Sequence, residues 1–297
     1  MYNNQRTVKL NNSKEIPILG LGTYRLKNKD SLKSLIRDAI LTGYRHFDTA
    51  TVYKNEEIIG EAFEEIFSDE TLNISREDVW VTSKLSPSEQ GYRKALNAVQ
   101  RSLKNLKFDY IDMYLIHWPG VYKLKVSDPE NSVKRQESWK ALEELYSKGI
   151  VRSIGVSNYQ IKHLKELAIY STVTPAVNQC EFHPLLYTKD LVDYCKESGI
   201  SFMAYSSFGE GRLVDGSVKI PELDLISKKH NASTAQVLLS WSLHRGIIVI
   251  PKATSIKRLE DNFASLKIKL DDDDIIAIDS ISNTNSSRFC WDSNTIS

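Results

Sequence analysis

The sequence lacks three features that would each point to a particular class of protein: a long apolar stretch, a low-complexity linker, and an excess of charge of one sign. Without an apolar stretch of about 20 residues, no membrane-spanning helix is expected. Lys and Arg total 39 and Asp and Glu total 38, so charge gives no reason to expect nucleic acid or an anionic membrane as a partner. The polar start at residues 1–6 does not resemble a signal peptide, and we expect a cytoplasmic protein in which residues 1–297 form one domain.

Cysteine is scarce, and no cluster of metal ligands stands out. Cys180, Cys195 and Cys290 lie far apart and form no Cys-x-x-Cys pair, which indicates reduced thiols. The acidic run at residues 271–274 precedes apolar residues, and such a run is typical of the first turn of a helix, where the helix dipole favours negative charge. We therefore predict no metal site.

What the sequence does contain is an alternation of short apolar strands and amphipathic helices. Residues 7–10 and 15–18 predict an N-terminal β-hairpin that could plug the bottom of a barrel. The alternation then recurs eight times, which predicts an α/β fold of the (β/α)8 TIM barrel type, with a short tail from residue 280 and with a doubly wound open sheet as the alternative. Strands are expected at residues 19–24, 44–48, 79–84, 110–117, 153–158, 175–179, 200–205 and 247–252.

Two local patterns bear on this interpretation. Gly20-x-Gly22 lacks the third glycine of a dinucleotide fingerprint, so we interpret it as a tight turn of the barrel. Ser233 and Gln236 have the spacing of a capping box, which predicts the start of a helix there.

Polar side chains occupy the ends of the predicted strands. Because the carboxyl ends of the strands meet at one face of a barrel, these side chains are expected to be neighbours. Each one alone has an ordinary structural explanation, but an acid, a phenol, an ammonium and an imidazole at one mouth favour catalysis. In chain order they are Thr23 and Tyr24, Asp48 and Tyr53, Lys84, His117, Ser157 and Asn158, Gln179, Tyr205, and Lys252.

Several motifs resemble the aldo-keto reductases, over nearly the whole chain. They lie at residues 43–53, 82–85, 115–119, 155–158, 178–179 and 250–252. By this resemblance Asp48, Tyr53, Lys84 and His117 correspond to the family's catalytic tetrad, which reduces a carbonyl with hydride from a nicotinamide cofactor. The chemistry is consistent: Tyr53 would donate the proton, Lys84 would lower the tyrosine's pKa from about 10, Asp48 would hold Lys84, and His117 would polarise the carbonyl oxygen.

The resemblance also implies a set of cofactor contacts. Ser157, Asn158 and Gln179 correspond to residues that bind the nicotinamide carboxamide, and Tyr205 to the ring on which the nicotinamide stacks. Residues 206–211 correspond to a loop that could cross the pyrophosphate, although Ser207-Phe208 replaces the more usual Pro-Leu. The implied cofactor-binding residues are Thr23, Asp48, Ser157, Asn158, Gln179, Tyr205, Ser206, Phe208, Lys252, Ser255, Arg258, Asp261 and Asn262.

The choice between NADPH and NADH depends on residues 252–258. Ser255 can cap a helix that contains Arg258, so a hydroxyl, backbone N–H groups and two cations, Lys252 and Arg258, would converge where a phosphate could sit. This favours NADPH/NADP+, with NADH possible but weaker. Ala253 departs from the serine often present in the family and removes one possible phosphate contact. Asp261 and Asn262 correspond to positions near the adenine.

The expected partner is a small-molecule carbonyl substrate, bound by a monomer. Tyr24, Val52, His117, Trp118 and Tyr122 fall where the family builds an apolar, aromatic cleft, and Phe289, Cys290 and Trp291 of the tail are possible lid contacts. Two other functions stay open at this point. One is a cofactor-binding regulatory or redox-sensing subunit with little turnover, and the other is a metal-dependent barrel hydrolase, for which we find no ligand cluster.

Overall fold

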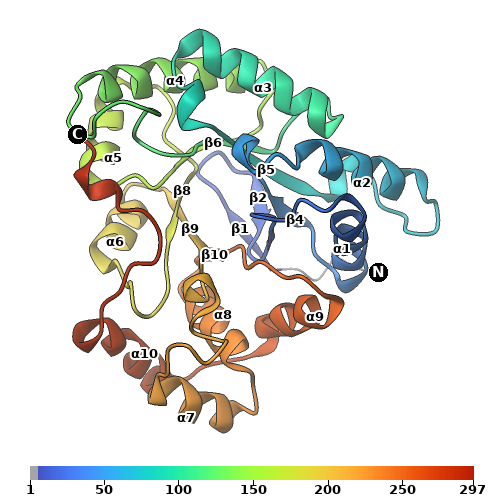
Figure 1. Cartoon of the computed structure of the whole chain (residues 1–297), viewed down its shortest axis with the longest axis vertical. Coiled ribbons are helices and arrows are strands. Elements are labelled where there is room, and N and C mark those ends of the chain that lie inside the picture. The colour runs from blue at the N-terminus through green and yellow to red at the C-terminus, as the bar shows by residue number, and fades with distance from the viewer. Residues whose placement is uncertain (1–5) are drawn as a thin grey trace.

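The computed structural model describes residues 6–297, so most of the polar start considered above lies outside the described residues. Its main sheet has eight parallel strands in sequential order from β3 to β10. A parallel bridge between Leu19 and Val249 joins the two edges and closes the sheet (Figure 1). The closed sequential order confirms the (β/α)8 barrel and excludes the doubly wound alternative. The strands are β3 (Leu21–Gly22), β4 (His46–Asp48), β5 (Trp80–Leu85), β6 (Met113–Ile116), β7 (Ile154–Ser157), β8 (Val177–Glu181), β9 (Ser201–Tyr205) and β10 (Ile248–Val249).

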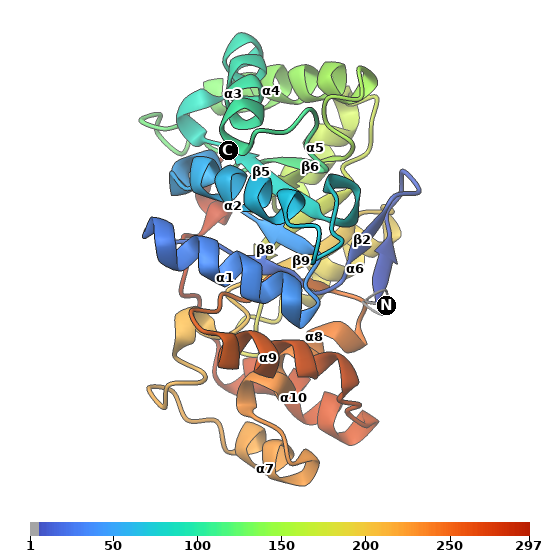
Figure 2. The ribbon, with the colours of Figure 1, turned by 90° about the vertical axis from the view of Figure 1, so that its right-hand side faces the viewer.

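The N-terminal hairpin forms as predicted. Strands β1 (Thr7–Lys9) and β2 (Glu15–Pro17) pair antiparallel, with Val8 opposite Ile16. Leu10 and Ile16 are buried against side chains from the barrel interior, among them Met113. The hairpin therefore closes one end of the barrel, and Figure 2 shows it projecting at one side of the molecule.

The helices surround the barrel and bury their apolar faces against the strands (Figure 1). Their starts follow the local sequence signals: Asn28 caps α1, Ser233 and Gln236 form the predicted capping box of α8, and Asp271 caps α10 so that the acidic run is its first turn. They are α1 (Lys29–Thr42), α2 (Glu56–Ser68), α3 (Tyr92–Leu106), α4 (Glu130–Ser147), α5 (Ile161–Tyr170), α6 (Lys189–Glu197), α7 (Pro221–His230), α8 (Thr234–His244), α9 (Ile256–Ala264) and α10 (Asp272–Thr284). Within residues 6–297, none of the helices is both long and apolar enough to cross a membrane.

The first and last barrel strands are much shorter than predicted, two residues each. They meet where the barrel closes, through backbone bonds from Val249 N–H to Ile18 O (2.8 Å), from Gly20 N–H to Val249 O (2.8 Å) and from Gly22 N–H to Pro251 O (3.1 Å). Pro251 has no N–H to continue a ladder. A Cβ on Gly22 would lie 2.6 Å from the carbonyl oxygen of Ile250. Gly22 thus allows a close approach of the two strands, whereas a Cβ on Gly20 would lie 2.6 Å from the His46 side chain. Both glycines lie in or beside β3, so the predicted turn is wrong.

Candidate active site

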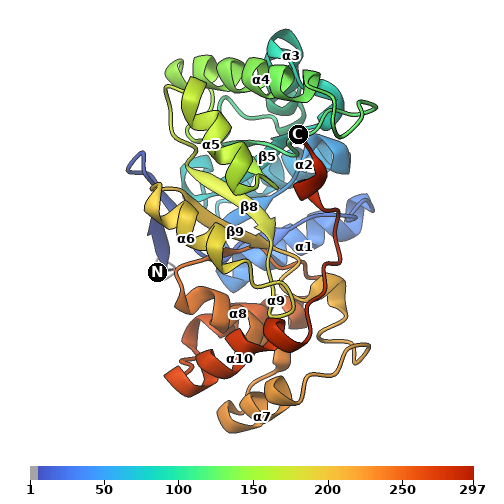
Figure 3. The ribbon, with the colours of Figure 1, turned by 90° about the vertical axis from the view of Figure 1, so that its left-hand side faces the viewer.

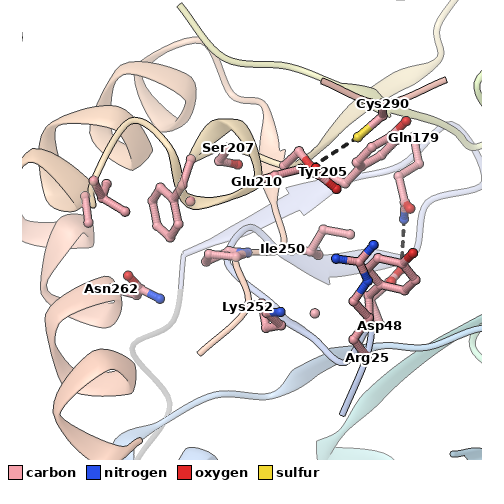
Figure 4. A pocket seen from close by; sticks show the side chains of 18 of the residues that line it. Arg25, Asp48, Gln179, Tyr205, Ser207, Glu210, Ile250, Lys252, Asn262 and Cys290 are labelled. Carbon is pink, nitrogen blue, oxygen red and sulfur yellow. Dashed lines mark hydrogen bonds between the residues drawn. The ribbon is translucent and has the colours of Figure 1, made fainter. Parts of the chain in front are cut away.

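A cavity of about 1120 Å³ opens at the carboxyl ends of the barrel strands. Figure 4 shows Cys290, Gln179 and Asp48 at one side of it, Asn262 at the other, and Ile250 and Lys252 between them. Its walls come from β3 and β4, from β6 to β10, from the loop after β9, from the starts of α8 and α9, and from the tail after α10. The site is therefore assembled from segments along the whole chain.

The buried end of the cavity, which we define by Asp48, Tyr53, Lys84 and His117, is organised by one lysine. Lys84 is fully buried on β5, and its Nζ lies 2.5 Å from Asp48 Oδ1 and 2.8 Å from Thr49 O. The same Nζ lies 3.4 Å from Tyr53 Oη. Burial raises the pKa of Asp48 and lowers the pKa of Lys84, and the attraction between the two opposes both shifts. Lys84 does not itself line the cavity, but it contacts two residues that do, Asp48 and Tyr53.

His117 lies at the end of β6, beside Tyr53. The two rings meet edge to face with centroids 5.8 Å apart, and Tyr24 contacts the other side of Tyr53 at 5.1 Å. Burial, aided by the positive charge of Lys84, holds the pKa of His117 well below its ordinary value. The imidazole is therefore neutral at physiological pH and can hydrogen-bond an oxygen without carrying charge.

The structure differs from our expectation for the pKa of Tyr53. Burial raises this pKa well above its ordinary value, and the negative charge of Asp48 raises it further. The expected lowering by Lys84 does not prevail because burial is the largest influence on this pKa, and Asp48 Oδ1, 2.5 Å from Lys84 Nζ, offsets the lysine's charge. Tyr53 consequently holds its proton firmly in the ligand-free cavity.

Four polar or aromatic residues on β7, β8 and β9 form a connected network next to the buried end. Gln179 Nε2 donates to Asp48 Oδ2 (2.8 Å), and Ser157 Oγ donates to Gln179 O (2.8 Å). Asn158 Nδ2 donates to Ser157 Oγ (3.0 Å), and Tyr205 Oη donates to Asn158 Oδ1 (2.7 Å). The network fixes both the carboxamides and the Tyr205 ring on the cavity wall.

Two backbone positions beside this network have unusual geometry. Asn158 (φ 64°) and Ser206 (φ 52°) adopt the left-handed conformation, which non-glycine residues rarely adopt and which often occurs at functional sites. Both residues line the cavity. Their conformation turns the chain where β7 and β9 end, and the residues that follow Ser206 continue along the cavity wall.

The cavity wall carries two buried polar atoms that have no hydrogen-bond partner within residues 6–297. They are Ser207 Oγ, on the loop after β9, and His117 Nδ1. Because buried polar groups are normally hydrogen-bonded, these atoms indicate a wall that is completed by a polar ligand.

The cationic end of the cavity, which we define by Lys252, Thr254, Ser255 and Arg258, is more exposed. Ser255 caps α9 through a 3.4 Å bond from Arg258 N–H, as the sequence predicted, and Arg258 Nη1 donates to Thr254 Oγ1 (3.1 Å). Lys252, Thr254 and Arg258 line the cavity, so two cations face it beside a helix N-terminus. Such a combination suits an anionic group.

Most of the predicted site residues meet at this cavity, but four do not line it. Lys84 is fully buried behind Asp48 and Tyr53. Thr23 is buried behind the wall, where its hydroxyl donates to Asp48 O (2.9 Å). Ser255 is exposed and serves as a helix cap. Tyr122 is 64% exposed beside Lys123 and lies outside the cavity lining, so its assignment to the substrate cleft stays a prediction. The predicted residues that do line the cavity are Tyr24, Asp48, Val52, Tyr53, His117, Trp118, Ser157, Asn158, Gln179, Tyr205, Ser206, Phe208, Lys252, Arg258, Asp261 and Asn262.

Other lining residues were missed from the sequence. Arg25 lies three residues past the end of β3, and its position one residue past the predicted strand 19–24 was a usable signal. Residues 233–235 at the start of α8 also line the cavity, and Ser233 Oγ donates to Asp261 Oδ2 (2.8 Å). The capping box predicted that α8 starts here, but the sequence contains no signal that the start of α8 faces the cavity. Cys290 and Trp291, which we expected as lid contacts, line the cavity.

A closed barrel that carries buried ionisable side chains at the carboxyl ends of its strands has the architecture of a barrel enzyme. The chain belongs to the aldo/keto reductase family, whose sequence model matches residues 18–283, and it is therefore an oxidoreductase. It is 42% identical to a glyoxal reductase from Bacillus subtilis over 93% of this chain and 92% of that protein. It is 41% identical to a 9,11-endoperoxide prostaglandin H2 reductase from Trypanosoma cruzi over 94% of this chain and 92% of that protein.

Solved structures agree with this assignment. An aldo-keto reductase enzyme from a Medee basin deep-sea metagenome library superposes with a TM-score of 0.86 at 38% identity, covering 97% of this chain and 98% of that chain. An aldo-keto reductase from Bombyx mori, in complex with NADP, superposes with a TM-score of 0.86 at 33% identity, covering 96% of this chain and 95% of that chain.

Proposed function

We propose that the chain reduces aldehydes and ketones to alcohols with NADPH and that Tyr53 is the general acid. The observation that supports this most strongly is the position of Lys84 Nζ between Asp48 Oδ1 and Tyr53 Oη at the end of a long cavity. A lysine held there has no packing role that requires its charge. It can stabilise the tyrosinate that forms when Tyr53 gives up its proton.

Each residue of the buried end then has one task. When bound, a reduced nicotinamide supplies the hydride that forms the new C–H bond. Tyr53 supplies the proton to the carbonyl oxygen, and Lys84 stabilises the phenolate left behind until solvent returns a proton. His117, being neutral, orients the carbonyl oxygen by a hydrogen bond and stabilises the charge that develops on it.

The residues present fit a dinucleotide. The carboxamides of Asn158 and Gln179 and the ring of Tyr205 would hold the nicotinamide next to Tyr53. The unpartnered Ser207 hydroxyl would face the pyrophosphate from the loop after β9. Asp261 and Asn262 would lie near the adenine at the far side of the cavity, where Figure 4 shows Asn262.

The cationic end favours NADPH over NADH. Lys252 and Arg258 would pair with the phosphate that distinguishes the two cofactors, and charge-assisted bonds of this kind are the stronger ones. One of the relatives is named as an NADP-dependent D-sorbitol-6-phosphate dehydrogenase, from Malus domestica, and the Bombyx mori structure holds NADP. Both support the same preference.

We also propose that the substrate is a small carbonyl compound bound between aromatic walls, by a monomer formed of one domain. Tyr24, Val52, Trp118 and Trp291 line that part of the cavity. The relatives include proteins named glyoxal reductase and aldehyde reductase, from Bacillus subtilis and Saccharomyces cerevisiae. Gel filtration that shows a stable larger assembly would contradict the monomer.

The experiment that tests the function follows the absorbance of reduced nicotinamide with NADPH and with NADH. The substrates are a small dicarbonyl, an aromatic aldehyde, an aldose and a quinone. We expect faster loss of NADPH than of NADH with at least one aldehyde. Tight NADPH binding without turnover would contradict the proposed reductase and would favour a regulatory or redox-sensing subunit.

A further inference from the structure

The tail after α10 is held against the barrel at two separate places. Figure 1 and Figure 3 show it running from α10 toward α5, along the side of the molecule away from the hairpin. At its far end, buried Arg135 donates from Nη1 to Ser297 O (2.8 Å) and to Pro119 O (2.9 Å). Ile296 is buried there, and its carbonyl lies 2.9 Å from His163 Nε2.

The second place is a buried carboxylate at the end of β8. Glu181 Oε1 accepts the backbone N–H of Phe289 (2.8 Å), and Oε2 accepts that of Cys290 (3.1 Å). His183 Nε2 lies 3.0 Å from Oε1, and Arg288 lies 3.8 Å from Oε2. The Glu181 side chain is fully buried, so water cannot replace these partners.

Between the two places the tail forms part of the cavity wall. Cys290 and Trp291 line the cavity, and the Trp291 ring meets Trp118 edge to face with centroids 5.5 Å apart. Trp291 is 69% exposed, so packing on its other sides contributes little to hold it. Its position is therefore set by bonds of its neighbours along the chain: the backbone bonds of Phe289 and Cys290 just before it, and the bond from Gln160 Nε2 to Ser293 Oγ (2.9 Å) just after it.

The same segment touches the loop after β9. Cys290 Sγ lies 3.5 Å from Ser206 Oγ, and Arg212 lies over the Phe289 ring, 4.8 Å from its centroid. Gly209 is packed so closely that a Cβ there would lie 2.7 Å from that ring. Bonds that hold Phe289 and Cys290 in place therefore also restrict the movement of the loop after β9 relative to the tail.

We propose that Glu181 is a positioning residue that holds Cys290 and Trp291 in place as the outer wall of the substrate region, and thereby sets how strongly the enzyme discriminates bulky from small carbonyl compounds. The part of this proposal that concerns substrates rests on the proposed function. A carboxylate accepts both N–H groups, whereas an amide in its place would turn an NH2 group toward one of them. Glu181→Gln should therefore release the tail while conserving the shape of the side chain.

The first test needs no turnover. Cys290 is half-buried, whereas Cys180 and Cys195 are buried, so an aromatic disulfide reagent should modify Cys290 first, and Cys290→Ser should remove this fast phase. In Glu181→Gln we expect the fast phase to speed up on the order of tenfold, because loss of the paired bonds favours local opening. An unchanged rate in folded Glu181→Gln overturns the proposal.

The matched control makes the same substitution at another buried acid. Glu56 bonds Ser83 (2.6 Å) and Asn105 (3.3 Å) on the far side of β5, and Glu56→Gln should leave the rate at Cys290 unchanged. Equal acceleration in both variants would indicate general loosening and would contradict a specific role for Glu181. If Glu181→Gln does not fold, hydrogen exchange of the unaltered protein decides: protection of the Phe289 and Cys290 amides supports the proposal, and exchange at the rate of a free peptide overturns it.

The second test separates positioning from plain structural support. In Glu181→Gln we expect KM for a bulky aromatic aldehyde to change at least about fivefold more than KM for a small dicarbonyl, because only the bulky compound reaches Trp291. Equal changes for the two compounds would contradict the specificity role. Accelerated thiol modification in a protein without turnover would sustain the positioning role and would reject the reductase.

Discussion

The two ends of the cavity are built in different ways. At the buried end, Asp48 and Lys84 are fixed by bonds to each other, to Thr49 and to Gln179. At the cationic end, Lys252 and Arg258 are exposed, and Arg258 has one bond to a neighbouring hydroxyl. The side chains of the buried end are thus held in place by the protein itself. Lys252 and Arg258, which would distinguish the two cofactors, would become ordered only when a ligand binds. Substitutions at the two ends should have effects of different kind and size.

The largest effect is expected for Tyr53→Phe. Loss of the general acid should lower kcat by about 10²–10⁴-fold while NADPH affinity changes little, because the phenol contributes a proton and the ring remains. Turnover under saturating NADPH and fluorescence titration of the cofactor measure the two quantities.

Tyr24→Phe is the matched control for this prediction. It makes the same change at a ring 5.1 Å from Tyr53 but at a position 48% exposed, and it should lose far less turnover. Retention of most activity in Tyr53→Phe would show that Tyr53 is not the general acid.

The next effect, on stability, is expected for Lys84→Met. This change leaves Asp48 buried without its cation, and breaking a buried pair in this way typically costs about 3–5 kcal/mol. Denaturant unfolding measures the loss. The exposed pair of Lys29 with Glu61 gives the control, since Lys29→Met should hardly move the unfolding midpoint. An equal shift in both variants would mean that the buried end is not specially dependent on its ion pair.

At the cationic end, Arg258→Ala and Lys252→Ala should act on cofactor choice alone. Each should weaken NADPH binding by about 10–100-fold, the value of one charge-assisted hydrogen bond, and NADH binding much less. Stability should stay nearly unchanged because both side chains are exposed. Dissociation constants for NADPH and NADH measure this effect. Equal weakening of both would show that Lys252 and Arg258 do not bind the phosphate that distinguishes the two cofactors.

The difference between the two ends also explains what could be predicted from the sequence. The barrel, the hairpin and the helix caps follow from local patterns: strand spacing, turn residues and capping residues act within a few positions of each other. The tetrad was assigned from the resemblance to a family. Three of the four residues of the buried end were also predictable from local patterns, because Asp48, Lys84 and His117 stand at or next to the end of a strand. Tyr53 instead ends the short turn that follows β4.

What could not be predicted depends on packing between distant segments. The start of α8 lies beside Asp261 through a bond between residues 28 positions apart, and no local pattern encodes that neighbour. The pKa of Tyr53 was predicted in the wrong direction because the pairing of Lys84 with Asp48 was foreseen but the strength of burial was not. The exposure of Tyr122 outside the cavity lining likewise has no signal in the residues around it.

The smallest effect is expected for Ser255→Ala. Ser255 is, with Thr23, one of two residues that we assigned to the cofactor from the resemblance but that do not line the cavity. Its hydroxyl accepts the Arg258 N–H at 3.4 Å, so removal of a long, exposed cap should cost about 1 kcal/mol or less of unfolding free energy. NADPH affinity should change less than about twofold, because a cap of this kind orders only the first turn of α9. Ser233→Ala is the matched control, since Ser233 caps α8 and also bonds Asp261 on the cavity wall, and its loss should be felt both in stability and in cofactor binding. A tenfold loss of NADPH affinity in Ser255→Ala with NADH unaffected would show instead that the hydroxyl turns to the phosphate when the cofactor binds. The cationic end would then be shaped by its ligand even more than the exposure of Lys252 and Arg258 implies.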